Sequence, residues 1–302
     1  MRNLKIILAY DGSNFHGWQF QTAMRTVQET VEKSLQDILG HEVRVTASGR
    51  TDAGVHALGQ VINFRTRSRI PAHGLLRALN TVFPPDLSAR EVREVSPDFH
   101  ARYLAISKKY VYVVDISTIP SPFLSRYVMN LPGGLDVQAM RQAAHALKGQ
   151  HDFSSFMGAG SSVKTTVREI FDFEIFGKGS RVFFCIRGSG FLRHMVRNIV
   201  GTLIPVGQAE MTPRDVERIL GLRDRTQAGP TAPPQGLYLV EVEYGGHGKS
   251  SDTDTHRRQG GEPGTGATGE NKKWLEEGLN DEGRCAGRRS GDEAASADQG
   301  DQ

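Results

Sequence analysis

Hydrophobic and polar positions over residues 4–244 follow the periods of strands and helices. Continuous or alternating apolar runs predict strands, and apolar residues three or four positions apart predict helices. In the first half, the capping-box pair Thr26 and Glu29 begins a helix that Gly40 ends. The elements predicted there are a strand over residues 4–10, this helix, strands over 43–47 and 61–64, and a helix around 75–79 that ends before Pro84-Pro85. The order is β-α-β-β-α-β, ending near Phe99.

The second half resembles the first in outline. Asp136 is expected to cap a helix that ends at Gly149. The other predicted elements are a strand over residues 110–115, a hairpin of strands 170–176 and 181–187, a helix over 191–206 and a closing strand over 237–244. We therefore expect an α+β protein of two pseudo-duplicated α/β halves, whose mostly antiparallel sheets join into one extended sheet. A cleft between such halves is a favoured binding site.

The composition changes at residue 246. The segment from there to the end holds 12 glycines in 57 residues, and its large apolar groups are Trp274, Leu275 and Leu279. Such a segment cannot bury enough surface to offset the entropy of ordering it. The predicted organisation is therefore an N-terminal half over residues 1–102, a C-terminal half over 103–245 and a disordered, acidic, glycine-rich tail over 246–302.

The charge is divided between these parts. The tail carries 8 Lys+Arg against 12 Asp+Glu, which leaves residues 1–245 with 29 against 22, a net charge of +7. A basic body is compatible with a polyanionic partner. Cys185 and Cys285 match neither a metal-ligand spacing nor a disulfide scaffold, and no apolar run is long enough to span a membrane. These features favour a cytoplasmic protein without a membrane partner.

One turn carries a candidate catalytic group. In the string Ser48-Gly49-Arg50-Thr51-Asp52-Ala53-Gly54-Val55-His56-Ala57, the carboxylate of Asp52 lies between two glycines and between two predicted strands. Glycines let a tight turn present Asp52 to an approaching molecule. The same residue types are also common in ordinary hairpin turns. No spacing typical of a metal site, a phosphate-binding loop or a serine nucleophile accompanies it, which leaves a single activated aspartate as the candidate.

Arginines and tyrosines are available as partners of Asp52. Arg193 and Arg197 stack at helical spacing on the helix predicted over residues 191–206. Either they form a solvated face, or one enters the cleft and pairs with Asp52, where a guanidinium would favour the ionised carboxylate that a nucleophile requires. Tyr110 and Tyr112 share one face of their strand. They either pack in the sheet or stack on a nucleobase, which is worth about 1–3 kcal/mol per base.

Six strings, in this order, resemble the tRNA pseudouridine synthase A family. They are Tyr10-Asp11-Gly12-Ser13 with Gly17-Trp18-Gln19, the string around Asp52, Asp98-Phe99-His100-Ala101-Arg102, Lys109-Tyr110-Val111-Tyr112, His194-Met195-Val196-Arg197-Asn198-Ile199-Val200-Gly201 and Ala228-Gly229-Pro230-Thr231-Ala232-Pro233. The resemblance covers residues 4–244 and leaves out the tail. It implies an isomerase that converts uridine to pseudouridine at positions 38, 39 and 40 of the anticodon stem-loop of tRNA. It also implies a homodimer that needs no metal or organic cofactor.

The resemblance assigns roles to five residues. The catalytic aspartate of the family falls on Asp52 and the arginine that pairs with it on Arg197. The tyrosine that contacts the target base falls on Tyr110, and an apolar residue that lines the pocket falls on Leu237. The arginine implicated in displacing the base falls on Arg50.

Two other functions are compatible with the same strings. A non-catalytic tRNA-binding or folding module could use this scaffold, although such a module has no chemical need for the carboxylate in Gly-Arg-Thr-Asp. A phosphotransfer enzyme with an aspartyl nucleophile is disfavoured, because no second acidic group lies near Asp52 in the sequence.

Overall fold

The computed structural model describes residues 1–160 and 163–245. Ten strands form one sheet, and the predicted tail over residues 246–302 lies outside the described residues. The strands are β1 (Arg2–Tyr10), β2 (Thr46–Ala47), β3 (His56–Thr66), β4 (Leu87–Val95), β5 (Ala105–Asp115), β6 (Met129–Asn130), β7 (Gly149–Asp152), β8 (Val167–Lys178), β9 (Arg181–Gly188) and β10 (Leu237–Tyr244). The helices are α1 (Val27–Leu39), α2 (Ala72–Val82), α3 (Val137–His145), α4 (Met195–Gly207) and α5 (Pro213–Leu222).

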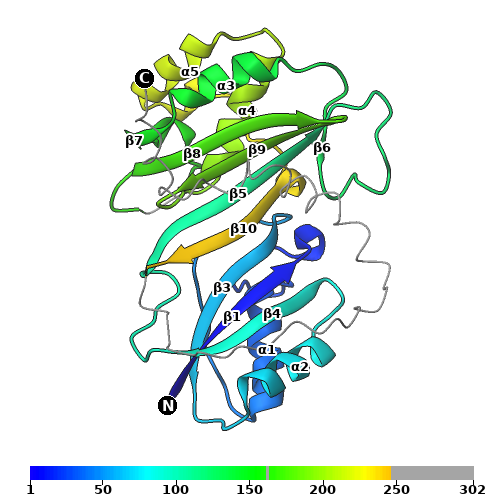
Figure 1. Ribbon diagram of the computed structural model, residues 1–302, viewed down its shortest axis with the longest axis vertical. Coiled ribbons are helices and arrows are strands. Elements are labelled where there is room, and N and C mark those ends of the chain that lie inside the picture. Colours follow the sequence, from blue (N-terminus) through cyan, green and yellow to red (C-terminus); the bar gives the residue numbers. More distant parts are fainter. Residues whose placement is uncertain (161–162, 246–302) are drawn as a thin grey trace, which may run out of the picture. The chain divides into compact units, whose positions relative to one another are not determined.

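The sheet runs without a break from one half of the sequence to the other, in the order β4-β1-β3-β10-β5-β9-β8-β7 (Figure 1). At the junction, β10 pairs parallel to β3 at Tyr238–His56 and Leu239–Ala57, and antiparallel to β5. Most other pairs are antiparallel, so the predicted single extended sheet is confirmed. All described residues belong to one compact unit of the chain, and the division at residues 102 and 103 stays a prediction.

Helices accompany each group of strands. In Figure 1, α1 and α2 lie beside β1, β3 and β4, and α3, α4 and α5 lie beside the other end of the sheet. The predicted ends of α1 are confirmed, since the Thr26 side chain accepts the Glu29 N–H and Gly40 takes a left-handed conformation with φ 72°. Asp136 caps α3 as predicted, but the helix ends at His145 because Gly149 (φ 92°) already begins β7. β7 and α5 were not predicted from the sequence pattern.

Two predicted elements differ from the structure. The strand expected over residues 43–47 is reduced to the two residues of β2, although Val43 and Val45 are buried. The alternation of Val43 and Val45 shows that one side of this segment is buried, but burial does not require the segment to pair with another strand. The helix expected from residue 191 begins only at Met195, because His194 takes a left-handed conformation (φ 59°) that interrupts helical geometry. Arg193 therefore precedes the helix and does not stack on Arg197.

The segment over residues 228–232 crosses α4 with no room for a side chain between them. A Cβ added to Gly201 would lie 1.7 Å from the carbonyl oxygen of Pro230, and one added to Gly229 would lie 2.3 Å from the oxygen of Gly201. The Gly229 N–H donates to Thr202 Oγ1 (2.9 Å), and the Ala232 N–H donates to the Arg197 carbonyl oxygen (3.1 Å). This close approach fixes the segment relative to the first two turns of α4.

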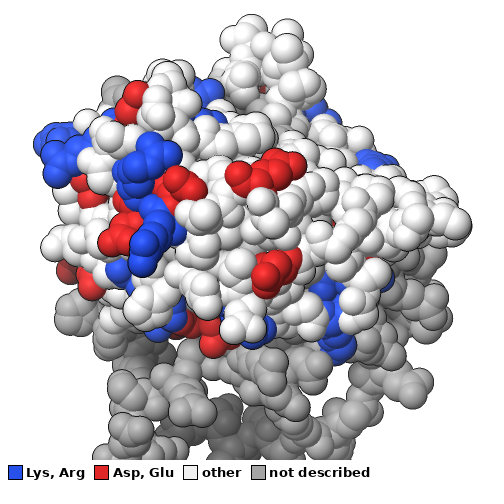
Figure 2. Space-filling model, turned by 90° about the horizontal axis from the view of Figure 1, so that it is seen from above, with Lys and Arg blue, Asp and Glu red and all other residues white. Residues whose placement is uncertain are grey.

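Charges of both signs mix on the face seen from above Figure 1. Figure 2 shows blue and red side chains next to one another at the left of this face, beside a large and mostly uncharged area. On α5, at this end of the molecule, the two signs pair directly, since Arg218 Nη2 lies 3.3 Å from Asp215 Oδ1. This face presents no patch of one sign to a polyanion.

We expect Gly201→Ala to lower the free energy of unfolding by about 1–3 kcal/mol, because its methyl group would meet the backbone of Pro230. Gly221→Ala in α5 is the matched control: a Cβ there meets nothing within 4 Å, and the change should be neutral or stabilising by up to about 1 kcal/mol. Urea unfolding of the two variants measures the difference. Equal stability would show that the approach of residues 228–232 to α4 is not tight.

Candidate active site

The turn that carries Asp52 is bound at several points to the strands below it. Ser48 Oγ donates to Gln60 Oε1 (2.7 Å), and Gln60 Nε2 donates to the Gly49 carbonyl oxygen (2.9 Å). The hydroxyl groups of Tyr10 and Thr51 share a hydrogen bond of 2.8 Å. All of these side chains except Gly49 are buried in β1, β3 or the turn itself. The position of Asp52 is therefore set by the sheet.

Asp52 meets an arginine from the other half of the chain. Arg197 Nη1 donates to Asp52 Oδ2 at 3.0 Å, and Arg197 Nε donates to the carbonyl oxygen of Ala232 at 2.7 Å. The Arg197 side chain is 13% exposed and that of Asp52 is 28% exposed. Of the two interpretations of the arginines, the structure thus supports the pairing. Because the Arg197 guanidinium is bound at two points and is mostly buried, its direction toward Asp52 is fixed better than that of an arginine at the surface.

A histidine contacts the same carboxylate oxygen. His194 Nε2 lies 3.5 Å from Asp52 Oδ2. Among the described residues, Asp52 Oδ1 has no hydrogen bond or ion pair, so both contacts fall on one oxygen. The sequence patterns did not single out His194, although it lies three positions before Arg197 in the helix predicted over residues 191–206. That spacing and its place in the string His194-Met195-Val196-Arg197 were the available signals.

Tyr110 lies in β5 near Asp52 and is almost fully buried. Its ring packs edge-on against Phe191, with the ring centres 5.1 Å apart. Burial raises the pKa of the Tyr110 hydroxyl well above its usual range, and nearby Tyr10 and Asp52 act in the same direction. The hydroxyl is therefore protonated at neutral pH. Tyr112 shares the face as predicted but is a core residue, fully buried, with its hydroxyl donating to the Pro233 carbonyl oxygen (2.8 Å).

The two remaining predicted site residues lie at opposite extremes of exposure. Leu237 begins β10 opposite Tyr112 of β5 and is buried. Arg50 is exposed in the same turn as Asp52. Within residues 1–160 and 163–245 it makes no hydrogen bond or ion pair. The structure therefore brings Asp52, Arg197 and Tyr110 together with Leu237 nearby in the sheet, and leaves Arg50 at the surface.

Lys108 is a second residue that the sequence patterns did not single out. Its Nζ donates to the Ser48 carbonyl oxygen (2.7 Å), at the start of the turn that carries Asp52. Burial, with the nearby charges of Arg102 and Arg168, lowers the pKa of Lys108 to about 8. A signal was present, because Lys108 lies two positions before Tyr110 and thus on the same face of β5.

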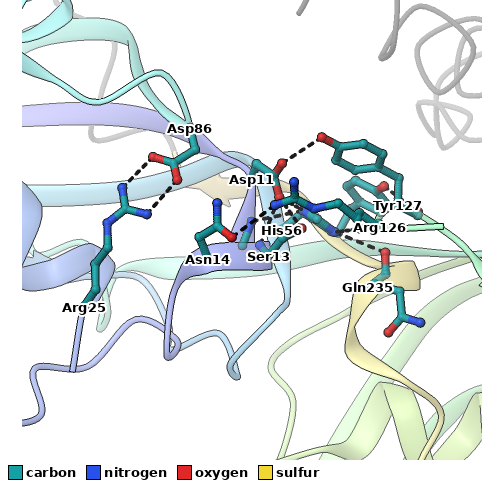
Figure 3. Close-up of polar contacts among 11 residues, drawn as sticks. Asp11, Ser13, Asn14, Arg25, His56, Asp86, Arg126, Tyr127 and Gln235 are labelled. Carbon is teal, nitrogen blue, oxygen red and sulfur yellow. Dashed lines mark hydrogen bonds and ion pairs between the residues drawn. The ribbon is translucent and has the colours of Figure 1, made fainter. Parts of the chain in front are cut away.

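A second polar network lies beside the turn (Figure 3). His56, which begins β3, has Nδ1 3.2 Å from Asp11 Oδ1 and Nε2 within 3.2 Å of the carbonyl oxygens of Arg126 and Gln235. The Tyr127 hydroxyl donates to Asp11 Oδ2 (2.8 Å). The network therefore ties the ends of β1 and β3 to two segments of the C-terminal half.

The same network supports the junction of the sheet. The ring of His56 stacks on that of Tyr238 with centres 4.8 Å apart, where β3 meets β10. Burial acts to raise the pKa of Asp11, but hydrogen bonds from His56, Ser13 and Tyr127 outweigh it and hold that pKa well below its usual range. Asp11 is therefore ionised at neutral pH and stabilises the junction as an acceptor.

The described part of the chain offers neither a metal site nor a membrane span. It holds no group of three or more His, Cys, Asp or Glu side chains that could bind a metal ion. None of its helices is long and apolar enough to cross a bilayer.

Known proteins are similar to this chain over most of its length. A family model described as tRNA pseudouridine synthase matches residues 6–104 and 143–245. The tRNA pseudouridine synthase A of Acetivibrio thermocellus is 46% identical over 81% of this chain and 100% of its own length. That of Moorella thermoacetica is 48% identical over 80% and 99%. A solved archaeal box H/ACA sRNP Nop10-Cbf5 complex is similar at 13% identity and a TM-score of 0.30, over 80% of this chain and 47% of its own.

We expect Lys108 to titrate near pH 8, well below the 10.5 of an ordinary lysine, because its burial and the two arginines disfavour the charged form. Its side chain is charged below that pH and loses the charge as pH rises through 8. An NMR titration of protein with labelled lysine side chains measures this, and Lys108→Arg assigns the signal. A signal that titrates near 10.5 would show that the ammonium is solvated.

Proposed function

Because the chain belongs to the tRNA pseudouridine synthase family and is an isomerase that makes pseudouridine in tRNA, we propose that Asp52 is its nucleophile. The observation that supports this role is the contact of Arg197 with Asp52 Oδ2, which leaves Oδ1 without a partner among the described residues. The proposed substrate is the uridine at positions 38, 39 and 40 of the anticodon stem-loop. We also propose that the protein acts as a cytoplasmic homodimer.

The reaction needs an ionised carboxylate that a nucleotide can reach. Isomerisation breaks the N1–C1′ bond, turns the uracil and joins C5 to C1′, after which the hydrogen on C5 leaves as a proton and N1 gains one. Asp52 acts either by adding to the ring or at the sugar, and in both routes it donates an electron pair from a carboxylate oxygen. Arg197 supports both routes, since it holds Oδ2 of the carboxylate and leaves Oδ1 without a partner among the described residues.

The neighbouring residues fit the handling of a displaced base. A uridine within a stem must leave its stack, at a cost of a few kcal/mol. Tyr110, next to Asp52 and protonated, offers an aromatic ring to the extruded uracil, and Leu237 offers an apolar wall. Arg50, exposed and unpaired within the described residues, is available to fill the space that the base leaves. Lys108, close to Arg102 and Arg168, adds positive charge that favours the RNA backbone.

We expect Asp52→Asn to abolish tritium release from tRNA that carries 5-³H-uridine, by at least about a thousandfold, because an amide cannot supply the electron pair. Filter binding should show tRNA affinity within about threefold of the unchanged protein, since the side chain keeps its size. Asp37→Asn, an exposed position on α1, is the matched control and should leave both measurements unchanged.

Two results would contradict this role. Full tritium release by Asp52→Asn would remove Asp52 as the nucleophile. If the unchanged protein binds tRNA and releases no tritium, the chain is a non-catalytic tRNA-binding or folding module on the same scaffold.

We expect new pseudouridine at positions 38, 39 and 40 when tRNA that lacks modifications is treated with the purified protein. Primer extension after carbodiimide treatment maps these positions, and Asp52→Asn protein is the control for background stops. Pseudouridine confined to another stem would contradict the proposed anticodon specificity and leave the isomerase activity in place.

A further inference from the structure

His194 lies where it can orient the carboxylate of Asp52. Its Nε2 approaches Oδ2 to 3.5 Å, and Arg197 Nη1 approaches the same atom to 3.0 Å. Oδ2 can only accept hydrogen bonds, so the proton of a neutral His194 ring belongs on Nε2. Arg197 makes the hydrogen bond to this oxygen, and the imidazole at 3.5 Å is a second group that limits how the carboxylate can turn.

The backbone of His194 takes a strained conformation that places its ring beside Asp52. His194 has φ 59° and ψ 2°, a left-handed conformation that few residues with a side chain adopt. Its carbonyl oxygen accepts the Asn198 N–H (2.9 Å), and the adjacent Arg193 carbonyl oxygen accepts the Gly158 N–H (2.8 Å). Strained residues that the surrounding structure holds in place are concentrated at functional sites.

Gly158 makes room for the ring. A Cβ added to Gly158 would lie 2.7 Å from His194 Nδ1. The Nδ1 side of the ring therefore lies against a position without a side chain, and the Nε2 side lies against Asp52. The imidazole is enclosed between the two and is 25% exposed.

Charges around His194 come from four side chains. Burial lowers the pKa of His194; Asp52 acts to raise it, and Arg197, Arg193 and Arg225 act to lower it further. The net result is a pKa below the ordinary 6.5. His194 is therefore neutral at neutral pH and becomes charged only in more acid solution.

We propose that His194 is a positioning residue whose neutral ring, donating from Nε2 to Oδ2, turns Oδ1 of Asp52 toward the uridine. This inference rests on the proposed role of Asp52. Arg197 supplies a fixed positive charge beside the carboxylate, and His194 supplies a second contact without a second charge. Protonation of His194 adds that second charge, which holds the carboxylate more tightly and makes it a weaker nucleophile.

His194→Ala should slow single-turnover tritium release by about 10–100-fold at pH 7.5, because a misplaced reacting group costs rate and not affinity. The Kd for tRNA should stay within about threefold. His194→Gln, which keeps an N–H donor, should recover most of the rate. His73→Ala, at an exposed histidine of α2, is the matched control and should match the unchanged protein.

The pH profile separates positioning from a merely structural role. In the unchanged protein, the rate should fall in acid solution as His194 gains its proton, and this fall should be absent from His194→Gln. If His194→Ala does not fold, Gly158→Ala provides the second test, because its methyl group displaces the ring without removing it. A loss of rate with unchanged tRNA affinity is expected there too.

The possible failures can be told apart. Active Asp52→Asn protein would overturn the proposed function itself. Inactive Asp52→Asn protein, combined with His194→Ala protein of unchanged rate and pH profile, would overturn only the inference about His194. Weakened tRNA binding by His194→Ala with an unchanged single-turnover rate would also overturn it, because His194 would then contact RNA instead of Asp52.

Discussion

The ion pair between Asp52 and Arg197 joins positions 145 residues apart and forms the centre of the described site. Its two members come from different halves of the chain, so neither half contains the site alone. A partly buried guanidinium without a carboxylate, or the reverse, would lose most of its solvation without compensation. The geometry that brings the two groups to 3.0 Å must therefore be set by the rest of the structure, since an isolated pair of this kind adds little stability.

Two contacts between elements set that geometry. On one side, β3 pairs with β10 through only two residue pairs, and the stack of His56 on Tyr238 with the Asp11 network reinforces this short junction. On the other side, residues 228–232 lie so close to α4 that glycine is required at Gly201, and the Ala232 carbonyl oxygen then holds Arg197 Nε. The first contact places the turn of Asp52, and the second places the arginine. Both consist largely of backbone and buried groups, which is why the site is rigid enough to orient a carboxylate.

The bounds of a helix or strand could be predicted wherever the residues of that element alone determine them. The cap of α1 at Thr26, its end at Gly40 and the bounds of β10 follow from residue types within one element. The motif around Asp52 and the resemblance it carries pointed to the site. The predictions that were wrong concern elements whose structure depends on contacts between distant segments of the chain. Val43 and Val45 alternate as in a strand, but no partner pairs with them. The start of α4 depends on the left-handed backbone of His194, which Gly158 accommodates from a segment far away in sequence. Lys108 became a site residue only through its bond to Ser48.

The two groups in contact with Asp52 Oδ2 differ in charge, and under the proposed roles of Asp52 and His194 this difference matters for the chemistry. A nucleophilic carboxylate must be ionised at neutral pH, yet every positive charge near it also lowers the energy of its electron pairs and weakens attack. Arg197 provides one fixed charge, because a guanidinium keeps its proton throughout the physiological range. A second cation would bind the Asp52 carboxylate more tightly without improving the orientation of its oxygens. A neutral imidazole constrains the same oxygen and leaves the charge balance unchanged, and the three arginines around His194 help to keep it neutral. Both contacts fall on Oδ2, and Oδ1 of Asp52 has no partner among the described residues.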